Sequence, residues 1–543
     1  MQSAQGDWQV AAAEQIRRVE AAPLPPNIFA LLREAAADVP DRDAWHFIAS
    51  GRTITYAALL EQVERLAAGL ASLGVRRGDH VAVMLSNVPE MPATWLALGR
   101  IGAVMVPVNV RYTGHELHYL LSDSGADRLV IQEDYLPALD AMPAPRPALA
   151  DVVVVGAARP GQRRWQDLVD GFRPGFAPER EPVLDDLMNI QYTSGTTGLP
   201  KGCLLTQRYW LTCARAYSDC DGLRLRNILT GNPYFYMTPQ WLLLMAFYQR
   251  GTLFVAPHIS LTRFPEWMRR YRIEFCIFPM DIISQVPERP DDADNCIVRA
   301  NIYIHRREQH AEAERRFGFP ARSAFGMTEI GLGMFTPLGA AEMVGSGSCG
   351  MAAPFREVRI ADLEGNTLPA GRTGELLIRG PGLLKGYHNK PEATAAAFHG
   401  DWFRTGDLAS MDARGFVTIH GRIKEMIRRA GENISATEVE AALLAIPHVA
   451  EAAAIPVPDP LRGEEVKAYV GLEPGTTPVD LPPERIVELC RGRLAPFKVP
   501  RYIEYRTVPL PRSTSGKVRK PDLAAEKPDL RQGSWDRVSG RWM

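Results

Sequence analysis

The stretch from Tyr192 to Gly202 combines hydroxyl side chains, glycines and a lysine in a way that suits phosphate binding. It follows an apolar run at 187–191, which we expect to form a strand. Its hydroxyl residues and glycines are Thr193, Ser194, Gly195, Thr196, Thr197 and Gly198. Glycines let backbone N–H groups approach a polyphosphate closely, and Lys201 adds a positive charge for its oxygens. A Walker loop is excluded because Pro200 precedes the lysine, so a plain turn is the alternative to a phosphate loop.

A second polar stretch, Phe325–Glu329, ends in a hydroxyl and a carboxylate. The hydroxyl of Thr328 and the carboxylate of Glu329 are polar groups that could bind another molecule. Read alone, the pair of Thr328 and Glu329 is also typical of a surface turn.

Two stretches nearer the C-terminus each end in a charged residue. Asp407 ends the stretch 402–407, and its carboxylate has two oxygens that can accept hydrogen bonds. Lys517 ends a Ser/Gly-rich segment at 511–517, where a lysine with no other context is usually solvated surface.

These stretches lie between patterns that predict an α/β protein. Apolar runs typical of buried strands occur at 80–85, 128–131, 253–256 and 275–278. Between them, segments such as 56–73 repeat apolar residues at helical spacing. Short apolar strands alternating with amphipathic helices indicate sheets covered by helices.

The pattern changes after about residue 350. Short strands at 357–360 and 375–379 predict a small β-rich subdomain. From residue 421 onward the pattern is mixed α+β, and Ser435 or Thr437 could cap a helix beginning near Val439. We therefore predict a large N-terminal domain of α/β-layered subdomains, 1–420, and a small, mobile α+β domain, 421–543.

Composition limits the classes of partner. The chain has 543 residues, with 62 Lys and Arg against 63 Asp and Glu, so no bulk positive charge favours nucleic acid. Its seven cysteines include no C-x-x-C pair, which favours a reducing compartment. The first twenty residues lack a signal-peptide core, and no stretch has the composition of a membrane span. We expect a soluble, cytoplasmic enzyme, and the sequence leaves its oligomeric state open.

Five motifs in order, from Tyr192 to Lys517, resemble those of the adenylate-forming superfamily of acyl-CoA synthetases, peptide-synthetase adenylation domains and luciferases. The resemblance covers nearly the whole chain and implies an ATP-binding site. It implies that Phe325 and Gly326 border the nucleotide, that Thr328 contacts the α-phosphate and that Glu329 holds Mg²⁺.

The same resemblance assigns residues of the C-terminal part. It implies that Asp407 binds both ribose hydroxyls and that Arg422, in the run Gly421–Glu425, reaches the ribose. Lys517 is then the adenylation lysine, and Lys424 is the hinge about which the C-terminal domain rotates between two half-reactions.

In the second half-reaction the rotated domain presents a different face to coenzyme A. The segment 428–433 should lie on this face, with Gly431 leaving room for pantetheine and Arg428 meeting phosphates of CoA. For Arg428 and its neighbour Arg429, a solvated edge is an equally good interpretation.

The acyl pocket departs from the family pattern. Many relatives have Pro-x-Phe-His after the phosphate loop, whereas this chain has Tyr236 at the last position, so a histidine's role there is in doubt. Tyr234, Tyr236 and Trp241 are candidates for the pocket wall, and an aromatic cluster of this kind is equally typical of a core.

A second departure is the missing glycine-rich turn at 301–307. Bulkier residues there, including Tyr303, should narrow the pocket. Asp281 lies near the same wall by resemblance, although a solvated carboxylate at a helix start is the simpler interpretation. Aromatic rings with a carboxylate would suit a cationic acid such as a betaine, which we state as a hypothesis.

The leading prediction is an acid–CoA ligase that uses ATP, Mg²⁺ and coenzyme A to activate a small carboxylic acid as an acyl-adenylate. One alternative is an adenylating enzyme that passes its acid, or an unusual small anion, to a carrier protein or an amine. Another is a non-catalytic nucleotide-binding regulator, against which the retention of Glu329, Asp407 and Lys517 argues.

Overall fold

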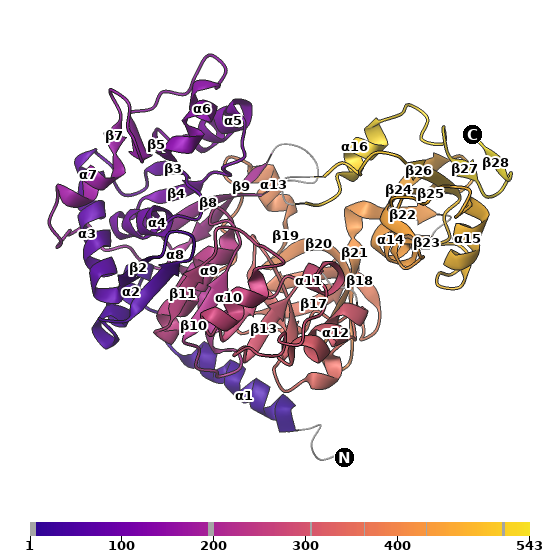
Figure 1. Ribbon diagram of the computed structural model, residues 1–543, viewed down its shortest axis with the longest axis horizontal. Coiled ribbons are helices and arrows are strands. Elements are labelled where there is room, and N and C mark those ends of the chain that lie inside the picture. The colour runs from indigo at the N-terminus through magenta and orange to yellow at the C-terminus, as the bar shows by residue number, and fades with distance from the viewer. Residues whose placement is uncertain (1–6, 194–199, 304–306, 363, 430–431, 513–515) are drawn as a thin grey trace. The chain divides into compact units, whose positions relative to one another are not determined.

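The computed structural model describes residues 7–193, 200–303, 307–362, 364–429, 432–512 and 516–543. The chain divides into two compact units (Figure 1). Unit 1 consists of Met1–Val358, Ile378–Phe403 and Arg414–Val417, and unit 2 of Arg359–Leu377, Arg404–Ala413 and Thr418–Met543. The predicted boundary at residue 420 stays a prediction; unit 2 contains all of 421–543 and two earlier segments.

Unit 1 contains two large sheets. The nine-stranded sheet has the order β16-β15-β14-β13-β12-β10-β11-β1-β2. Along the sheet from β13 through β12, β10 and β11 to β1, neighbouring strands are parallel, and β1 and β2 are antiparallel. Its strands are β1 (Asp43–Phe47), β2 (Arg52–Thr55), β10 (Asn227–Thr230), β11 (Thr252–Val255), β12 (Phe275–Ile277), β13 (Arg299–Ile302), β14 (Ala321–Met327), β15 (Gly331–Phe335) and β16 (Met351–Ala352).

The second sheet of unit 1 has seven strands in the order β7-β6-β5-β3-β4-β8-β9. Its strands are β3 (His80–Met84), β4 (Val104–Pro107), β5 (Arg128–Gln132), β6 (Asp151–Val155), β7 (Arg163–Arg164), β8 (Leu187–Thr193) and β9 (Lys201–Thr206). All neighbours are parallel except β8 and β9, which form an antiparallel hairpin at one edge. The predicted phosphate loop is the connection of this hairpin.

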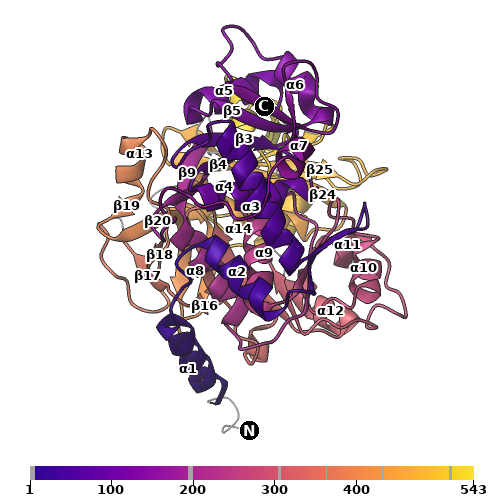
Figure 2. The ribbon, with the colours of Figure 1, turned by 90° about the vertical axis from the view of Figure 1, so that its left-hand side faces the viewer.

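Helices cover the sheets of unit 1, and several of them pack side by side (Figures 1 and 2). They are α1 (Asp7–Ala21), α2 (Ile28–Asp38), α3 (Tyr56–Ser72), α4 (Glu90–Ile101), α5 (Gly114–Ser124), α6 (Leu136–Asp140), α7 (Trp165–Asp170), α8 (Gln207–Asp219), α9 (Met237–Gln249), α10 (Phe264–Arg270), α11 (Asp281–Gln285), α12 (Arg307–Phe317) and α13 (Pro391–Ala396), with 3₁₀ turns η1 (Glu133–Tyr135) and η2 (Ala341–Met343). The helix predicted at 56–73 is confirmed as α3, which Thr55 caps by accepting from the Ala58 N–H.

A five-stranded sheet contains the places where the chain passes between the units. Its order is β17-β18-β20-β19, and β21 also pairs with β20. Its strands are β17 (Glu357–Ala361), β18 (Thr373–Arg379), β19 (Phe398–His399), β20 (Trp402–Met411) and β21 (Val417–Arg422). This sheet is the β-rich region expected after residue 350.

The C-terminal part of unit 2 forms a seven-stranded sheet of order β23-β22-β25-β26-β27-β28, with β24 paired to β25. Its elements are η3 (Ile423–Glu425), β22 (Met426–Arg429), β23 (Glu432–Ser435), α14 (Ala436–Leu444), β24 (Val449–Asp459), β25 (Gly463–Leu472), α15 (Pro483–Arg491), β26 (Tyr502–Arg506), α16 (Lys520–Ala525), β27 (Trp535–Asp536) and β28 (Arg541–Trp542). Ser435, one of the two predicted caps, accepts from the Glu438 N–H.

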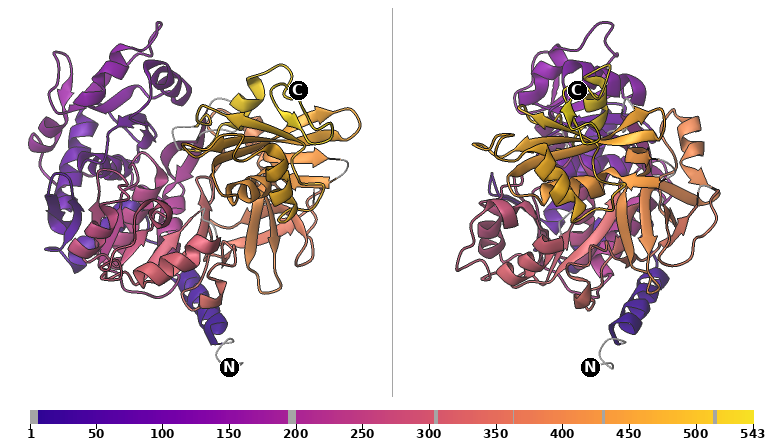
Figure 3. Two further views of the ribbon diagram at one scale, coloured as in Figure 1. Left: turned by 45° about the vertical axis from the view of Figure 1, so that its right-hand side comes forward. Right: turned by 90° about the vertical axis from the view of Figure 1, so that its right-hand side faces the viewer.

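The two faces of this sheet carry different helices (Figures 1 and 3). Ala452, Ala454 and Val466 pack with residues of α14 and α15, whereas Ala453 and Tyr469 pack with Leu523 of α16. The alternation follows from the two-residue period of a strand. It confirms the predicted α+β character of the C-terminal part.

None of the helices in the described part of the chain has both the length and the apolar composition that crossing a bilayer requires.

Candidate active site

The β8–β9 hairpin holds both ends of the predicted phosphate loop. Thr193 pairs directly with Lys201, and its hydroxyl donates to the Lys201 carbonyl over 3.4 Å. Ser194, Gly195, Thr196, Thr197 and Gly198 lie outside the described residues. The hairpin therefore places Thr193, just before the loop, opposite Lys201, just after it.

Helix α5 fixes the two flanks of the loop. The Tyr119 hydroxyl donates to the Pro200 carbonyl over 2.8 Å, and the Tyr192 hydroxyl donates to Asp123 over 2.6 Å. Burial, and then the bond to Asp123, raise the pKa of Tyr192, so the phenol stays protonated and remains a donor.

Thr328 and Glu329 occupy the turn between β14 and β15, where Met327 pairs with Gly331. Gly326 sits at a register shift in this hairpin, and a Cβ there would lie 2.5 Å from the Gly331 carbonyl oxygen. A glycine is therefore required for the strand to approach its partner before the turn. Phe325, which precedes it, pairs with Met334.

Tyr387 connects the turn with the phosphate hairpin. Its hydroxyl donates to Glu329 Oε1 over 3.1 Å, and the ammonium nitrogen of Lys201 lies 4.5 Å from the centre of its ring. Tyr387 and Glu329 are each only 8% exposed. Sequence reasoning missed Tyr387 because its partners are far away along the chain, and a tyrosine in a polar loop gives no signal of them.

The donor set at the turn fits a magnesium ion bound together with phosphate. Mg²⁺ in nucleotide sites keeps several waters and takes one or two carboxylates besides phosphate oxygens. The described residues contain no cluster of three or more His, Cys, Asp or Glu that would form an all-protein metal site. The buried carboxylate of Glu329 is the single acidic ligand that such a shared site needs.

Asp407 is held inside unit 2 by its own strand and by Arg422. Its N–H donates to the Thr405 hydroxyl over 3.0 Å, and Arg422 Nε lies 2.9 Å from Asp407 Oδ1. Arg422 also donates to the Thr405 carbonyl over 2.9 Å. Two residues that the resemblance assigns to the ribose are thus in contact.

Lys517 is exposed at the end of a short, closed segment. Arg512 and Val518 form a bridge across this segment, and Arg512 donates to the Gly516 carbonyl over 2.9 Å. The segment leads directly into α16, whose first residue is Lys520.

Lys520 joins the start of α16 to the predicted hinge. Its ammonium group lies 2.7 Å from Glu425 and 2.8 Å from Glu440. Burial opposes the charge, but the two carboxylates outweigh it and raise the pKa of Lys520. Glu425 follows Lys424 on η3, so an ion pair connects the hinge turn with the segment that carries Lys517.

The two arginines of β22 have different surroundings. The guanidinium group of Arg429 forms an ion pair with the fully buried Glu465 at 2.7 Å. Arg428 is exposed, and its N–H donates to Glu464. Of these two arginines, only Arg428 is exposed; Gly431 lies outside the described residues.

Trp241 and Tyr303 come together through Tyr217, which the sequence did not single out. The rings of Tyr217 and Trp241 stack with centroids 3.7 Å apart, and the hydroxyls of Tyr217 and Tyr303 are 2.8 Å apart. A Cβ on Gly326 would lie 3.4 Å from the Tyr217 hydroxyl, so the stack borders the strand that leads to Thr328.

The other predicted pocket residues have different surroundings. Tyr234 is buried against Phe47, with ring centroids 6.5 Å apart. Tyr236 is half-buried and tilted against Phe235. Asp281 is exposed at the first residue of α11, where a helix start suits a carboxylate.

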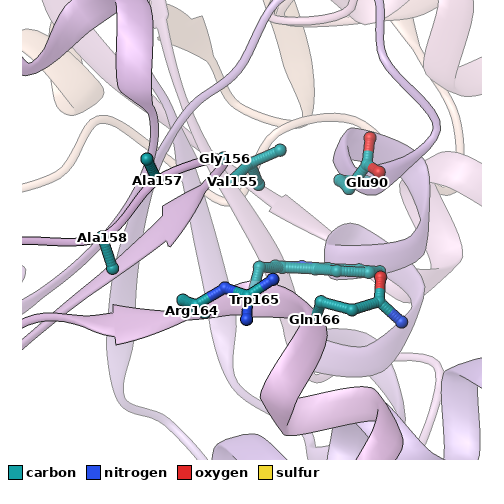
Figure 4. A pocket seen from close by; sticks show the side chains of 8 residues that line it. All are labelled: Glu90, Val155, Gly156, Ala157, Ala158, Arg164, Trp165 and Gln166. Atoms are coloured by element: carbon teal, nitrogen blue, oxygen red, sulfur yellow. The ribbon is translucent and has the colours of Figure 1, made fainter.

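A cavity of about 630 Å³ lies elsewhere in unit 1, lined by Glu90, Val155, Gly156, Ala157, Ala158, Arg164, Trp165 and Gln166. Figure 4 shows Trp165 and Gln166 on one side of it and Glu90 on the other. Arg52 pairs with Glu90 at 2.6 Å, so the one carboxylate of its wall is already neutralised. None of the motif residues lines this cavity.

Comparison with known proteins decides the family. The model of the AMP-binding enzyme matches residues 32–388, more than half of the chain, and that of the AMP-binding enzyme C-terminal domain matches residues 438–517. The chain belongs to the AMP-binding enzyme family. The predicted relationship to adenylate-forming enzymes and the predicted α/β fold class are both confirmed.

Named relatives are CoA ligases. The enzyme is 33% identical over 489 residues to crotonobetaine/carnitine–CoA ligase of Citrobacter koseri, a match that covers 87% of this chain and 93% of the relative. The crystal structure of ATP-bound MatB from Rhodopseudomonas palustris matches with a TM-score of 0.82 and 28% identity over 92% of this chain and 98% of MatB. O-succinylbenzoate CoA synthetase (MenE) from Bacillus subtilis, bound to its acyl-adenylate, matches with a TM-score of 0.80 and 25% identity over 94% of this chain and 100% of MenE.

Proposed function

We propose how the residues described above divide the work of this enzyme. The enzyme is an ATP-dependent acid–CoA ligase of the AMP-forming type, which uses ATP, Mg²⁺ and coenzyme A. It first joins a carboxylic acid to the α-phosphorus of ATP with loss of pyrophosphate, and then transfers the acyl group to the thiol of CoA with release of AMP. The observation that carries the assignment of residues is the contact of Tyr387 with both Lys201 and Glu329.

In the first half-reaction two anions approach each other while negative charge grows on phosphate oxygens. Fixed positive charges and hydrogen-bond donors aimed at those oxygens supply most of the catalysis. In our proposal Thr193 and Lys201 bind phosphate oxygens, Thr328 contacts the α-phosphate and Glu329 holds Mg²⁺, which neutralises phosphate charge. Lys517 donates to the carboxylate and the α-phosphate as the new P–O bond forms.

In the same proposal the adenosine part is held by residues of unit 2. Asp407 accepts hydrogen bonds from the two ribose hydroxyls, and Arg422, its neighbour at 2.9 Å, orients it. Phe325 and Gly326 border the nucleotide, as the family motif implies.

The second half-reaction uses a different arrangement of the C-terminal part. A rotation about Lys424 withdraws Lys517 and presents Arg428 and Gly431 to CoA. The thiolate of CoA attacks the acyl carbonyl, the bond to the phosphate oxygen breaks, and AMP leaves. The ion pairs of Lys520 with Glu425 and Glu440 support this step, because they tie the segment of Lys517 to the turn that follows the hinge residue.

The acid is proposed to be short. The stack of Tyr217 on Trp241, joined to Tyr303, occupies the space beside Gly326 on the strand that ends at the reacting groups. The names of the relatives favour an acid with a quaternary ammonium group, which an aromatic wall suits. Asp281 is exposed and has no described contact with the stack. The hypothesis of a quaternary ammonium acid therefore depends on the aromatic faces.

One experiment tests the function and the acid together. Purified enzyme with ATP, Mg²⁺ and CoA is given a panel of short neutral, betaine, aromatic and long-chain acids, and thioester and AMP are measured by mass spectrometry. We expect thioester from short acids, with a betaine acid preferred. A preference for long-chain or aromatic acids would contradict the proposed pocket, and preference for a neutral short acid would contradict the betaine hypothesis alone.

The final acceptor is proposed to be CoA itself, not a carrier protein. Omitting CoA should limit pyrophosphate release to about one equivalent of enzyme, because the adenylate stays bound. Continued turnover without CoA would favour water, an amine or another acceptor. We also propose that the enzyme works in the cytoplasm, which its seven free thiols suit.

A further inference from the structure

Tyr387 contacts two residues that the proposed function assigns to different tasks. Lys201 belongs to the phosphate hairpin and Glu329 to the turn between β14 and β15, and Tyr387 contacts both of them. The geometry points to Tyr387 as a positioning residue that fixes the phosphate-binding lysine and the metal-binding carboxylate relative to each other. This inference rests on the roles proposed for Lys201 and Glu329.

The backbone around Tyr387 is itself fixed to both elements. Tyr387 forms a bridge with Cys203 of β9, and the N–H of His388 donates to the Gly202 carbonyl over 2.8 Å. On the other side, the N–H of Leu384 donates to the Glu329 carbonyl over 2.8 Å. The segment therefore lies beside β9, joined to it by a single bridge, and reaches the turn of Glu329 within three residues.

The two contacts of the side chain use different parts of it. The ring face attracts the ammonium group of Lys201, and 4.5 Å is well inside the range of a cation–π contact. The hydroxyl donates to Glu329 Oε1, which is a charge-assisted hydrogen bond. The hydrogen bond is largely shielded from water because Tyr387 and Glu329 are buried, whereas Lys201 is half-buried. A substitution can thus remove one contact and keep the other.

Two substitutions separate the contacts. Tyr387→Phe keeps the ring and removes the hydroxyl, whereas Tyr387→Leu removes both. The matched control is Tyr56→Phe, which loses a buried hydroxyl that donates to the carbonyls of Ala246 and Gly251. Lys201→Ala and Glu329→Gln test the roles on which the inference rests. Thermal unfolding of each protein shows whether it is folded.

The readouts are binding equilibria of the purified enzyme. ATP binding is measured by calorimetry in EDTA, and Mn²⁺ binding to the enzyme with ATP is measured by electron paramagnetic resonance. We expect Tyr387→Phe to weaken Mn²⁺ binding about tenfold and to leave metal-free ATP binding within about twofold of wild type. We expect Tyr387→Leu to show the same loss for Mn²⁺ and a further loss of about three- to tenfold for ATP.

The outcomes separate this inference from the function beneath it. If Glu329→Gln and Lys201→Ala weaken Mn²⁺ and ATP binding while Tyr387→Phe binds Mn²⁺ as wild type does, the positioning role is wrong and the assignments stand. If Tyr56→Phe weakens Mn²⁺ binding as much as Tyr387→Phe, a general loss of packing explains the result and overturns the inference. If Glu329→Gln and Lys201→Ala bind both ligands normally, the assignments and this inference fall together.

Discussion

The candidate residues that bind phosphate and metal in unit 1, and the exposed Lys517 and Arg428 of unit 2, are held in opposite ways. In unit 1, Glu329 is buried and bonded to Tyr387, and Lys201 lies over the same ring. In unit 2, Lys517 and Arg428 are exposed. The ion pairs are formed by residues near them in the sequence, Lys520 and Arg429. Glu329 and Lys201 are fixed by direct contacts, as Asp407 is by Arg422 in unit 2, whereas Lys517 and Arg428 are exposed on fixed supports.

This difference matches the tasks that we propose. Side chains that hold ATP and Mg²⁺ through both half-reactions bind more tightly when they are preorganised, because binding then costs less side-chain entropy. A lysine that has to leave between half-reactions cannot be tied to a neighbour without making its departure unfavourable. The following predictions test this contrast, beginning with the largest effect.

Replacing Lys517 should remove adenylation without damaging the fold. In Lys517→Ala we expect the rate of pyrophosphate release to fall about a hundredfold or more, because one donor to the developing charge is lost. Thioester formation from added acyl-adenylate and CoA should continue near the wild-type rate, and the melting temperature should not change because the side chain is exposed. Intact adenylation in the variant would remove Lys517 from the mechanism.

Replacing Asp407 should weaken nucleotide binding through the ribose. We expect Asp407→Ala to raise the KM for ATP about tenfold to a hundredfold, since hydrogen bonds to a charged group are lost. Wild-type enzyme should discriminate against 2′-deoxy-ATP, and the variant should not. Equal discrimination by both proteins would show that Asp407 does not bind the ribose.

Replacing Lys520 should lower stability and uncouple the hinge from the segment of Lys517. Lys520→Met leaves Glu425 and Glu440 without their cation, and we expect the free energy of unfolding to fall by about 2 kcal/mol, less than for a fully buried pair. Lys498→Met is the control, because its pair with Glu438 is near the surface and should contribute under about 1 kcal/mol. Equal losses in the two variants would contradict a special role for Lys520.

The smallest expected effect separates Arg428 from Arg429. Arg428→Ala should raise the KM for CoA about three- to fivefold, as expected for one exposed phosphate contact, with no change in stability. Arg429→Ala should leave the KM for CoA unchanged and lower stability, because the fully buried Glu465 loses the nearest of its arginine partners and keeps Arg462 and Arg501. The reverse pattern would place CoA on the other side of β22.

The sequence was informative where chemistry is local. A loop of hydroxyls and glycines, a Thr-Glu turn and a capping serine are each recognisable within a few residues, and the structure places Thr193, Glu329 and Ser435 at a hairpin end, a turn and a helix start. The strands and α3 were predictable because burial imposes a period on the side chains.

Long-range contacts could not be predicted in this way. Tyr387 lies 58 residues from Glu329 and Tyr217 lies 86 residues from Tyr303, so no local pattern connects either pair. The sheet order that brings them together depends on which strands are neighbours in space. Sequence patterns identify the strands, but they do not specify these neighbours.

Strand β27, which lies between β26 and the edge strand β28, supplies the last residue along the chain of the core around β22. Trp535 is buried in the core that also contains Ile427 and Ile434, and β27 pairs with β26. A nascent chain that has not reached residue 535 already contains every residue of unit 1, together with Asp407, Arg422 and Lys517. It nevertheless lacks the indole of Trp535, so the core around β22 is completed only after all the candidate site residues have been translated.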